Sequence, residues 1–273
     1  MSIFGRLPKR AVFSIVFLVG LFLASVCLPT LLHWDPNSFD ASGVSEPLSP
    51  SLTHWFGTDD LGRDLLIRAI DGARVSLLVG IISVSISIVV GVLLGALSGF
   101  KGGLLDEVLM RLLDVFLAIP TLFLILTIQV MLKPSIVTVM VVIGLTSWMG
   151  VARLVRAEVL SLKERVFVTA ARARGIAPFW ILIRHILPHT APIIIISAMI
   201  GMGHAILTES VLSFLGMGVQ PPLASWGNML QNSLSYMLDA PWMTWVPGIF
   251  ITITVLALNF LGDGLREYWS PER

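Results

Sequence analysis

The chain has 273 residues, of which 56% are hydrophobic and 13% charged, with a net charge of +1 and a mean hydropathy of +0.90. A soluble domain usually carries about 25% charged residues, so this composition argues against a soluble enzyme. No basic patch interleaved with aromatic residues indicates nucleic-acid binding. The single cysteine, Cys27, excludes a disulfide framework and a cysteine-based zinc site.

The apolar residues form six long runs, each close to the length that crosses a hydrocarbon core as a helix. These runs cover residues 11–32, 76–99, 112–132, 136–152, 191–215 and 245–261. Backbone polar groups in lipid must be satisfied within the segment, so the sequence predicts an all-α polytopic membrane protein with six transmembrane helices. The first run follows Arg6, Lys9 and Arg10, and its length favours an uncleaved span over a signal peptide.

Basic residues are distributed unevenly between the two sides that these spans define. Of the 18 Lys and Arg residues, 14 lie on the side of the N-terminus, and seven of them fall between Arg153 and Arg184. Cytoplasmic connections carry the excess of Lys and Arg, so both termini are expected in the cytoplasm. The outer loop 216–244 has no basic residue and several aromatic ones, which is typical of a membrane interface.

The first outer connection, residues 33–74, has a helical pattern in its second half. Leu61, Leu65, Ala69 and Ala73 recur every four residues, which predicts a helix lying along the membrane surface. We expect an ion pair from Asp64 to Arg68 on this helix and a cap at Thr58 or Asp59. The pattern fits two roles equally well, docking a partner on the outer face or bracing the second span.

Small and polar residues inside the spans predict where helices meet. Gly91, Gly95 and Gly99 share one face of the second span, which indicates close packing against another helix. His204 and Glu209 lie at membrane depth in the fifth span, where ionisable groups face a cavity or a partner helix. Two interpretations remain for this pair, a polar point on a translocation pathway and a hydrogen bond between helices.

No motif for catalysis is present. The chain has neither the glycine-rich loop that binds ATP phosphates nor the paired histidines of a zinc protease. His185 and His189 are four residues apart, but Pro188 interrupts the helix and no third ligand is evident, so no metal site is expected. The serine and aspartyl motifs of intramembrane proteases are absent as well. The sequence therefore predicts a protein that is not an enzyme and binds no cofactor itself.

The basic connection between the fourth and fifth spans predicts a compact helical knob. Residues 166–174 favour a helix that ends at Gly175, which can adopt a positive φ. Pro178 suits the first turn of a second helix, and Pro188 is expected to stop that helix before the fifth span. This knob would fit a groove on a partner, or it would be an amphipathic linker resting on anionic lipid.

Four strings carry a resemblance to a known family. They are GTDDLGRD at 57–64 with GARVSL at 72–77, Thr169-Ala170-Ala171 with Gly175 and Leu187-Pro188, ESVLSFLGMG at 209–218 with Trp226-Gly227, and NFLGDGLR at 259–266. The second string resembles the EAA loop of ATP-binding-cassette importer permeases. The whole chain resembles the C-type permease subunit of the dipeptide, oligopeptide and nickel family. Thr169 stands where the loop has glutamate, so the resemblance implies no ionic contact there with an ATPase.

The resemblance implies a type I importer permease fold in the bacterial cytoplasmic (inner) membrane. Its parts would be residues 1–75, a transmembrane helix with a long extracytoplasmic loop, and residues 76–273, a five-helix core with a cytoplasmic coupling loop at 153–190. Coupling to the ATPases is implied for one set of residues: Thr169, Ala170, Ala171, Arg172, Gly175, Phe179, Leu187 and Pro188. Outer-loop docking is expected of another set: Gly57, Asp59, Gly62, Arg63 and Asp64.

The implied partners are a second, similar permease, two cytoplasmic ATPases that bind ATP and Mg²⁺, an extracytoplasmic binding protein and membrane lipid. The function implied is import of peptides or a related small solute such as nickel, driven by ATP. A stand-alone secondary transporter is the alternative, although such proteins carry inverted repeats that are not evident here. A receptor or scaffold is a weaker third reading.

Overall fold

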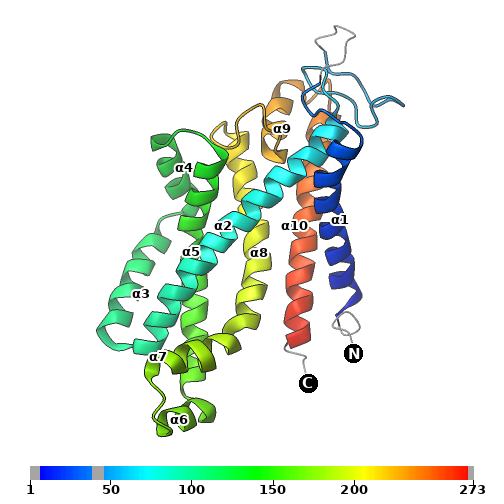
Figure 1. The fold of residues 1–273 in the computed structure, drawn as a ribbon. Helices are drawn as coiled ribbons and strands as arrows, with labels where there is room; N and C mark the ends of the chain where they lie inside the picture. Colours follow the sequence, from blue (N-terminus) through cyan, green and yellow to red (C-terminus); the bar gives the residue numbers. More distant parts are fainter. Residues whose placement is uncertain (1–6, 39–45, 270–273) are drawn as a thin grey trace.

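A computed structural model describes residues 7–38 and 46–269, and within these ranges the regular structure is helical (Figure 1). The helices are α1 (Lys9–Leu31), α2 (Leu65–Lys101), α3 (Gly103–Ala118), α4 (Thr121–Met131), α5 (Ile136–Lys163), α6 (Val166–Ala173), α7 (Pro178–Ile181), α8 (Leu187–Phe214), α9 (Trp226–Ser233) and α10 (Trp242–Trp269). Five helices of the described part are long and apolar enough to cross a membrane, or six if the bent pair α3–α4 forms one span. The predicted all-α polytopic fold is therefore confirmed.

The long helices run between two distinct ends of the bundle (Figure 1). One end, called here the α6 end, holds α6, α7, the start of α1 and the end of α10, where Arg10 Nη2 lies 2.9 Å from Glu267 Oε2. The opposite end, called here the α9 end, holds α9 and the connection between α1 and α2. The start of α1 and the end of α10 thus lie at the same end of the bundle, as the sequence predicted for the two termini. Residues 1–6 and 270–273 themselves lie outside the described ranges.

The most extensive helix packing within the described residues joins α2 to α5, through the glycine face that the sequence predicted. A β-carbon built at Gly91 would lie 2.6 Å from Val151 Cβ, and one built at Gly95 would overlap the carbonyl of Ala152. Gly99 faces the same helix. Absence of side chains at these positions lets the two backbones approach, which is how small residues stabilise helix pairs in lipid.

Replacing Gly95 with leucine is expected to separate α2 from α5 and to destabilise the protein by about 3 kcal/mol, the upper range for overpacking a tight interface. The measurement is thermal stability in mild detergent, monitored as the fraction of protein that remains monodisperse after heating. Gly248→Leu is the matched control, because a β-carbon at Gly248 meets no atom within 4 Å. Equal melting of the two variants would contradict this account of the interface.

The separate surface helix expected before the second span is not present. Residues 65–75 are the first turns of α2, which continues without a break to Lys101 and crosses the boundary placed at residue 75. Between Asp64 and Lys101 there is no proline and no residue with positive φ, so one helix continues into the span. The N-cap is Asp64, which accepts hydrogen bonds from the backbone of Leu66 and Ile67, rather than Thr58 or Asp59.

The third predicted span, 112–132, is broken in the middle. Helix α3 ends at Ala118 and α4 starts at Thr121, with a bend of 84° between them. Pro120 lacks an N–H and disfavours helical backbone at the preceding residue, and Ile119 is accordingly extended at φ −88° and ψ 126°. Hydropathy alone indicated one continuous helix, since the apolar run passes through the proline unchanged.

The expected helix stop at Pro188 is wrong. The chain continues from α7 through a π-helical turn, Leu182–Ile186, directly into α8, where Pro188 lies in the first turn. A proline inside a regular α-helix clashes with the carbonyl four residues earlier. The wider π turn immediately before Pro188 relieves that conflict, so the second half of the knob and the fifth span form one bent helix.

Candidate functional site

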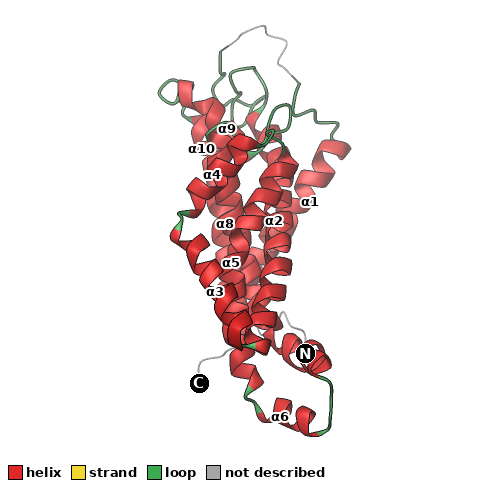
Figure 2. Ribbon diagram, turned by 90° about the vertical axis from the view of Figure 1, so that its left-hand side faces the viewer, coloured by secondary structure: helices red, strands yellow, loops and turns green. Residues whose placement is uncertain are grey.

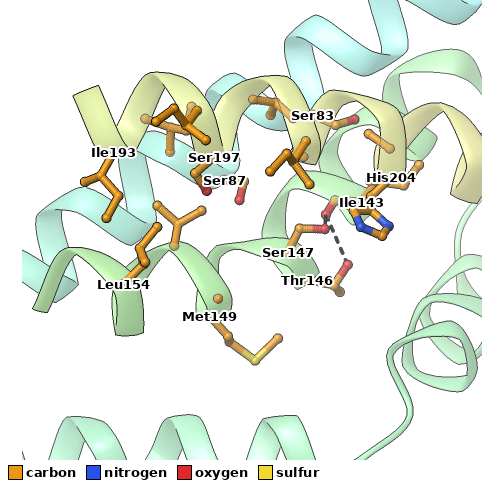
Figure 3. Close-up of a pocket in the computed structure, with 18 of the residues that line it drawn as sticks. Ser83, Ser87, Ile143, Thr146, Ser147, Met149, Leu154, Ile193, Ser197 and His204 are labelled. Carbon is orange, nitrogen blue, oxygen red and sulfur yellow. Dashed lines mark hydrogen bonds between the residues drawn. The ribbon is translucent and has the colours of Figure 1, made fainter. Parts of the chain in front are cut away.

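A cavity of about 940 Å³ lies among α2, α5 and α8, with contributions from α3, α4 and α10 (Figure 3). Its wall on α8 extends from His189 to Thr208, a distance of about 28 Å at the rise of an α-helix. The cavity therefore follows the length of the bundle rather than forming a compact pocket. A solute moving between the two ends of the bundle could follow this path.

Polar groups in the cavity are sorted along its length. Glu158, His189 and Arg266 line it near the α6 end, where α5 and α10 finish and α8 begins. Farther along, the polar lining consists of serine and threonine hydroxyls and one histidine: Ser83, Ser87, Thr121, Thr146, Ser147, Ser197, His204 and Thr208. Charged groups are thus confined to one mouth of the cavity.

The structure assigns His204 and Glu209 to different surroundings. His204 is exposed to the cavity, and Figure 3 shows its imidazole in the space between α5 and α8. Glu209 is fully buried on the other side of α8, where Oε1 accepts a hydrogen bond of 2.6 Å from Ser213 Oγ. Five residues rotate a helix by about 140°, so the two side chains cannot share a face.

Glu209 connects three elements at the α9 end. Its Oε2 accepts from Ser76 Oγ of α2 at 3.5 Å, and Ser76 Oγ in turn accepts from the backbone N–H of Trp226 at the start of α9 at 3.4 Å. Ser213 Oγ accepts from the N–H of Val219 at 3.0 Å. These contacts favour the interpretation of Glu209 as a hydrogen-bonding group between helices that holds the 216–227 segment in place.

The predicted knob is formed by α6 and α7 at the α6 end (Figure 1), and Figure 2 shows α6 beyond the ends of the long helices. Gly175 has φ +74° and ends α6, and Pro178 lies in the first turn of α7, as predicted. Val168 is fully buried in a cluster with Val159 of α5 and with the helix that follows. The knob is therefore fixed to the bundle by its apolar side.

The residues implied in coupling divide into an outward and an inward group. Outward-facing positions are Thr169, Ala170, Arg172, Gly175 and Phe179, and the Phe179 side chain is 64% exposed. Ala171 is buried under the knob, and Leu187 packs against the same cluster. Pro188 is exposed at the start of α8. A partner could therefore contact only the exposed members of the coupling set, which are fewer than the residues of the sequence motif.

The residues expected to dock a partner at the outer loop form a buried cluster. Asp59 accepts from the backbone N–H of Arg63 at 2.9 Å and from Arg63 Nε at 2.7 Å, and Arg68 Nε lies 3.4 Å from the same carboxylate. Arg68 therefore pairs with Asp59, and the predicted Asp64–Arg68 ion pair is not among the pairs of the described residues. Asp64 instead contacts His54 at 2.9 Å.

The two glycines of this set have turn roles. Gly57 and Gly62 have φ values of +75° and +74°, which favour glycine, and a β-carbon at Gly57 would lie 2.6 Å from the carbonyl oxygen of Leu48. Exposed side chains in this loop are instead neighbours of the named residues in sequence, chiefly Leu52, which is 96% exposed, and Trp55, which is 70% exposed. A docking role for Gly57, Asp59, Gly62, Arg63 and Asp64 stays a prediction. In the structure these residues chiefly stabilise the conformation of the loop.

That serine and threonine hydroxyls line the cavity was not predicted from the sequence. Ser83 and Ser87 are four residues apart, and Ser197, His204 and Thr208 follow at intervals of seven and four. Such spacing places polar residues on one face of a helix, and this was the available signal. It was obscured because other serines and threonines in the spans, such as those at 76 and 213, serve buried contacts.

Comparison with known proteins gives a consistent result. Residues 91–273 match the family described as binding-protein-dependent transport system inner membrane component. The chain is 36% identical to the oligopeptide transport system permease protein OppC of Bacillus subtilis, covering 98% of this chain and 87% of that protein. It is 40% identical to OppC of Escherichia coli K12 (97% and 87% covered) and 38% identical to the dipeptide permease DppC of B. subtilis (97% and 82%).

The fold is similar to a solved structure. An inward-facing conformation of the MetNI methionine ABC transporter aligns with a TM-score of 0.58 and 20% identity, covering 77% of this chain and 98% of that one. This likeness shows the fold, and the match over most of the chain together with relatives of 36–40% identity shows the family. The chain therefore belongs to the binding-protein-dependent transport system inner membrane components, the multi-pass permease subunits of ATP-binding-cassette importers.

Proposed function

We propose that this chain forms one half of the pathway of an ATP-driven importer of peptides. The observation that carries the proposal is the 36–40% identity to oligopeptide and dipeptide permeases over nearly the whole chain. The cavity along α8 supports it, because an open, polar-lined path suits a second, similar permease subunit as its opposite wall. Lipid would cover the remaining apolar faces. Family membership favours this importer over a stand-alone secondary transporter.

The α6 end is proposed to face the cytoplasm, and with it both termini. The argument is the distribution of charge: seven Lys and Arg residues lie between Arg153 and Arg184, whereas the segment 216–244 at the α9 end has none. Positive charge is retained on the cytoplasmic side. In this orientation the charged mouth of the cavity opens inward, and α9 with the α1–α2 connection lies outside.

The exposed knob would then be the contact for two cytoplasmic ATPases, which bind ATP and Mg²⁺ in place of this chain. Its outward surface combines small residues, Ala170 and Gly175, with the large exposed rings of Phe179 and Trp180. Because α7 continues through the π turn into α8, a push on the knob is transmitted directly to a wall of the cavity. Two alternative arrangements of this bent helix would give access from either side.

The substrate would arrive from an extracytoplasmic binding protein at the α9 end. The exposed Leu52 and Trp55 offer an apolar surface there, and the buried Asp59–Arg63–Arg68 cluster holds the loop that carries them. Peptides are the substrate class that the relatives support. Nickel or a nickel chelate is retained as the other solute of the same broader family.

Co-purification in mild detergent is expected to yield this chain with a second permease and ATPase subunits. After reconstitution in liposomes with the binding protein, peptide should stimulate ATP hydrolysis and be taken up, whereas a nickel salt should do neither. The isolated chain should hydrolyse no ATP. Uptake driven by an ion gradient in liposomes holding this chain alone would contradict the proposal, and stimulation by nickel in place of peptide would change the substrate class.

A further inference from the structure

The middle of the cavity is polar but carries no fixed charge. Its polar side chains, called here the neutral stretch, are Ser83, Ser87, Thr146, Ser147, Ser197 and His204, contributed by α2, α5 and α8 (Figure 3). The acidic and basic side chains of the lining, Glu158 and Arg266, belong to the α6 end. A solute in the neutral stretch therefore meets hydrogen-bonding groups without a carboxylate, ammonium or guanidinium beside it.

Three of the five hydroxyls in the neutral stretch already use their single donor within the bundle. Ser83 Oγ donates to the carbonyl of Met140 at 3.0 Å, Thr146 Oγ1 to that of Val142 at 2.8 Å, and Ser147 Oγ to that of Ile143 at 2.7 Å. Because each hydroxyl has a single donor and two acceptor positions, these oxygen atoms keep acceptor capacity, and the exposed Ser147 offers it most openly, since Ser83 and Thr146 are only 1% and 4% exposed.

His204 on α8 adds an N–H donor to the hydroxyls of Ser87 and Ser197, which donate to no group of the described residues. Neither ring nitrogen of His204 has a hydrogen-bond partner within residues 7–38 and 46–269, and the side chain is exposed to the cavity. A neutral imidazole has one N–H donor and one acceptor nitrogen. Acceptors on α2 and α5 thus face a donor on α8 across the same space.

A peptide main chain repeats one N–H donor and one carbonyl acceptor at every residue other than proline, whatever the side chains are. A neutral, mixed lining satisfies these groups, whereas a fixed charge would attract some peptides and repel others. Resting on the proposed function, we propose that the neutral stretch is a subsite that binds the peptide main chain through His204 and the facing hydroxyls. We expect this subsite not to discriminate peptides by the charge of their side chains, and an uncharged residue at position 204 to be what keeps acidic and basic peptides equally acceptable.

The first experiment compares two uncharged replacements in the reconstituted importer with its binding protein. His204→Leu removes the donor at similar size and should lower the initial uptake of a neutral tripeptide roughly three- to ten-fold, the effect of losing about one hydrogen bond. His204→Gln restores a donor and should retain more uptake than His204→Leu. Uptake is normalised to assembled complex, so a difference in folding does not enter the comparison.

The second experiment introduces charge. For each variant, uptake of an acidic, a neutral and a basic tripeptide is divided by the wild-type value for the same peptide, which cancels the preference of the binding protein. His204→Asp should depress the ratio for the acidic peptide roughly ten-fold more than that for the basic one, and His204→Lys should reverse the order. Ser85→Ala is the control, because Ser85 donates to its own helix at Ile81 and does not line the cavity.

The outcomes separate the subsite from the wider function. Equal uptake by His204→Leu and His204→Gln, or charged variants whose three ratios are equal, would overturn the subsite. If charged variants do not assemble, the Leu and Gln pair decides alone. Failure of the wild-type complex to take up any peptide would instead refute the proposed function.

Discussion

Substitution of Gly175 by leucine is expected to reduce peptide uptake at least ten-fold while the chain remains folded in the membrane. Gly175 has φ +74° and ends α6, and a β-carbon there would meet no atom of the described residues within 4 Å. The cost within the chain is limited to backbone strain, about 1–2 kcal/mol for a non-glycine residue in the left-handed region. The larger effect falls on the proposed partner, since the added side chain projects from the surface that would enter an ATPase groove.

The measurement for Gly175 is uptake and ATP hydrolysis by the reconstituted complex. In Gly175→Leu, ATP hydrolysis should no longer respond to peptide, because motion of the ATPases is not transmitted through α7 and α8. Gly175→Asn should be intermediate, since asparagine tolerates a positive φ but still adds a side chain. Gly20→Leu, the same change at an open position of α1 without positive φ, is the control. Uptake by Gly175→Leu within about two-fold of the wild type would remove the coupling role from this surface.

Substitution of Asp59 by alanine is expected to destabilise the chain by about 3–5 kcal/mol, as removal of one partner from a buried ion pair does. The Asp59 carboxylate faces two guanidinium groups, Arg63 Nε at 2.7 Å and Arg68 Nε at 3.4 Å, and the three side chains are between 3% and 9% exposed. Without the carboxylate both guanidinium groups lose their ion-pair partner, and Arg68 keeps only its hydrogen bonds to Pro36 and Asn37 and the more distant charges of Asp60 and Asp71. The backbone N–H groups of Leu61 and Arg63 also lose their acceptor.

Thermal stability in detergent measures this change, with Asp239→Ala as the control because Asp239 is exposed on the same end of the bundle. Asp59→Asn should fall between the two, since an amide oxygen still accepts from the backbone but carries no charge. A stability within about 1 kcal/mol of wild type in Asp59→Ala, combined with weaker capture of the binding protein, would show that Asp59 is a direct docking contact rather than part of the loop's core.

The sequence by itself determined the class of the fold and the main features of the knob. Long apolar runs have only one stable form in lipid, the helix, so hydropathy located the spans. Gly175 and Pro178 also acted as predicted, because the left-handed turn and the first helical turn depend on the residue itself rather than on its neighbours. The glycine face at 91, 95 and 99 was readable for a similar reason, since spacing along one helix fixes a shared face.

Only the tertiary structure decided which helix each face meets and how proline is accommodated. Hydropathy is the same on both sides of Pro120 and Pro188, yet the chain bends by 84° at the first and continues through a π turn at the second. From sequence, His204 and Glu209 were equally good candidates for the pathway. Packing placed His204 in the cavity and buried Glu209 among serines. Side-chain partners across helices depend on the arrangement of segments far apart in the chain, and that arrangement is set by packing of the whole bundle rather than by local pattern.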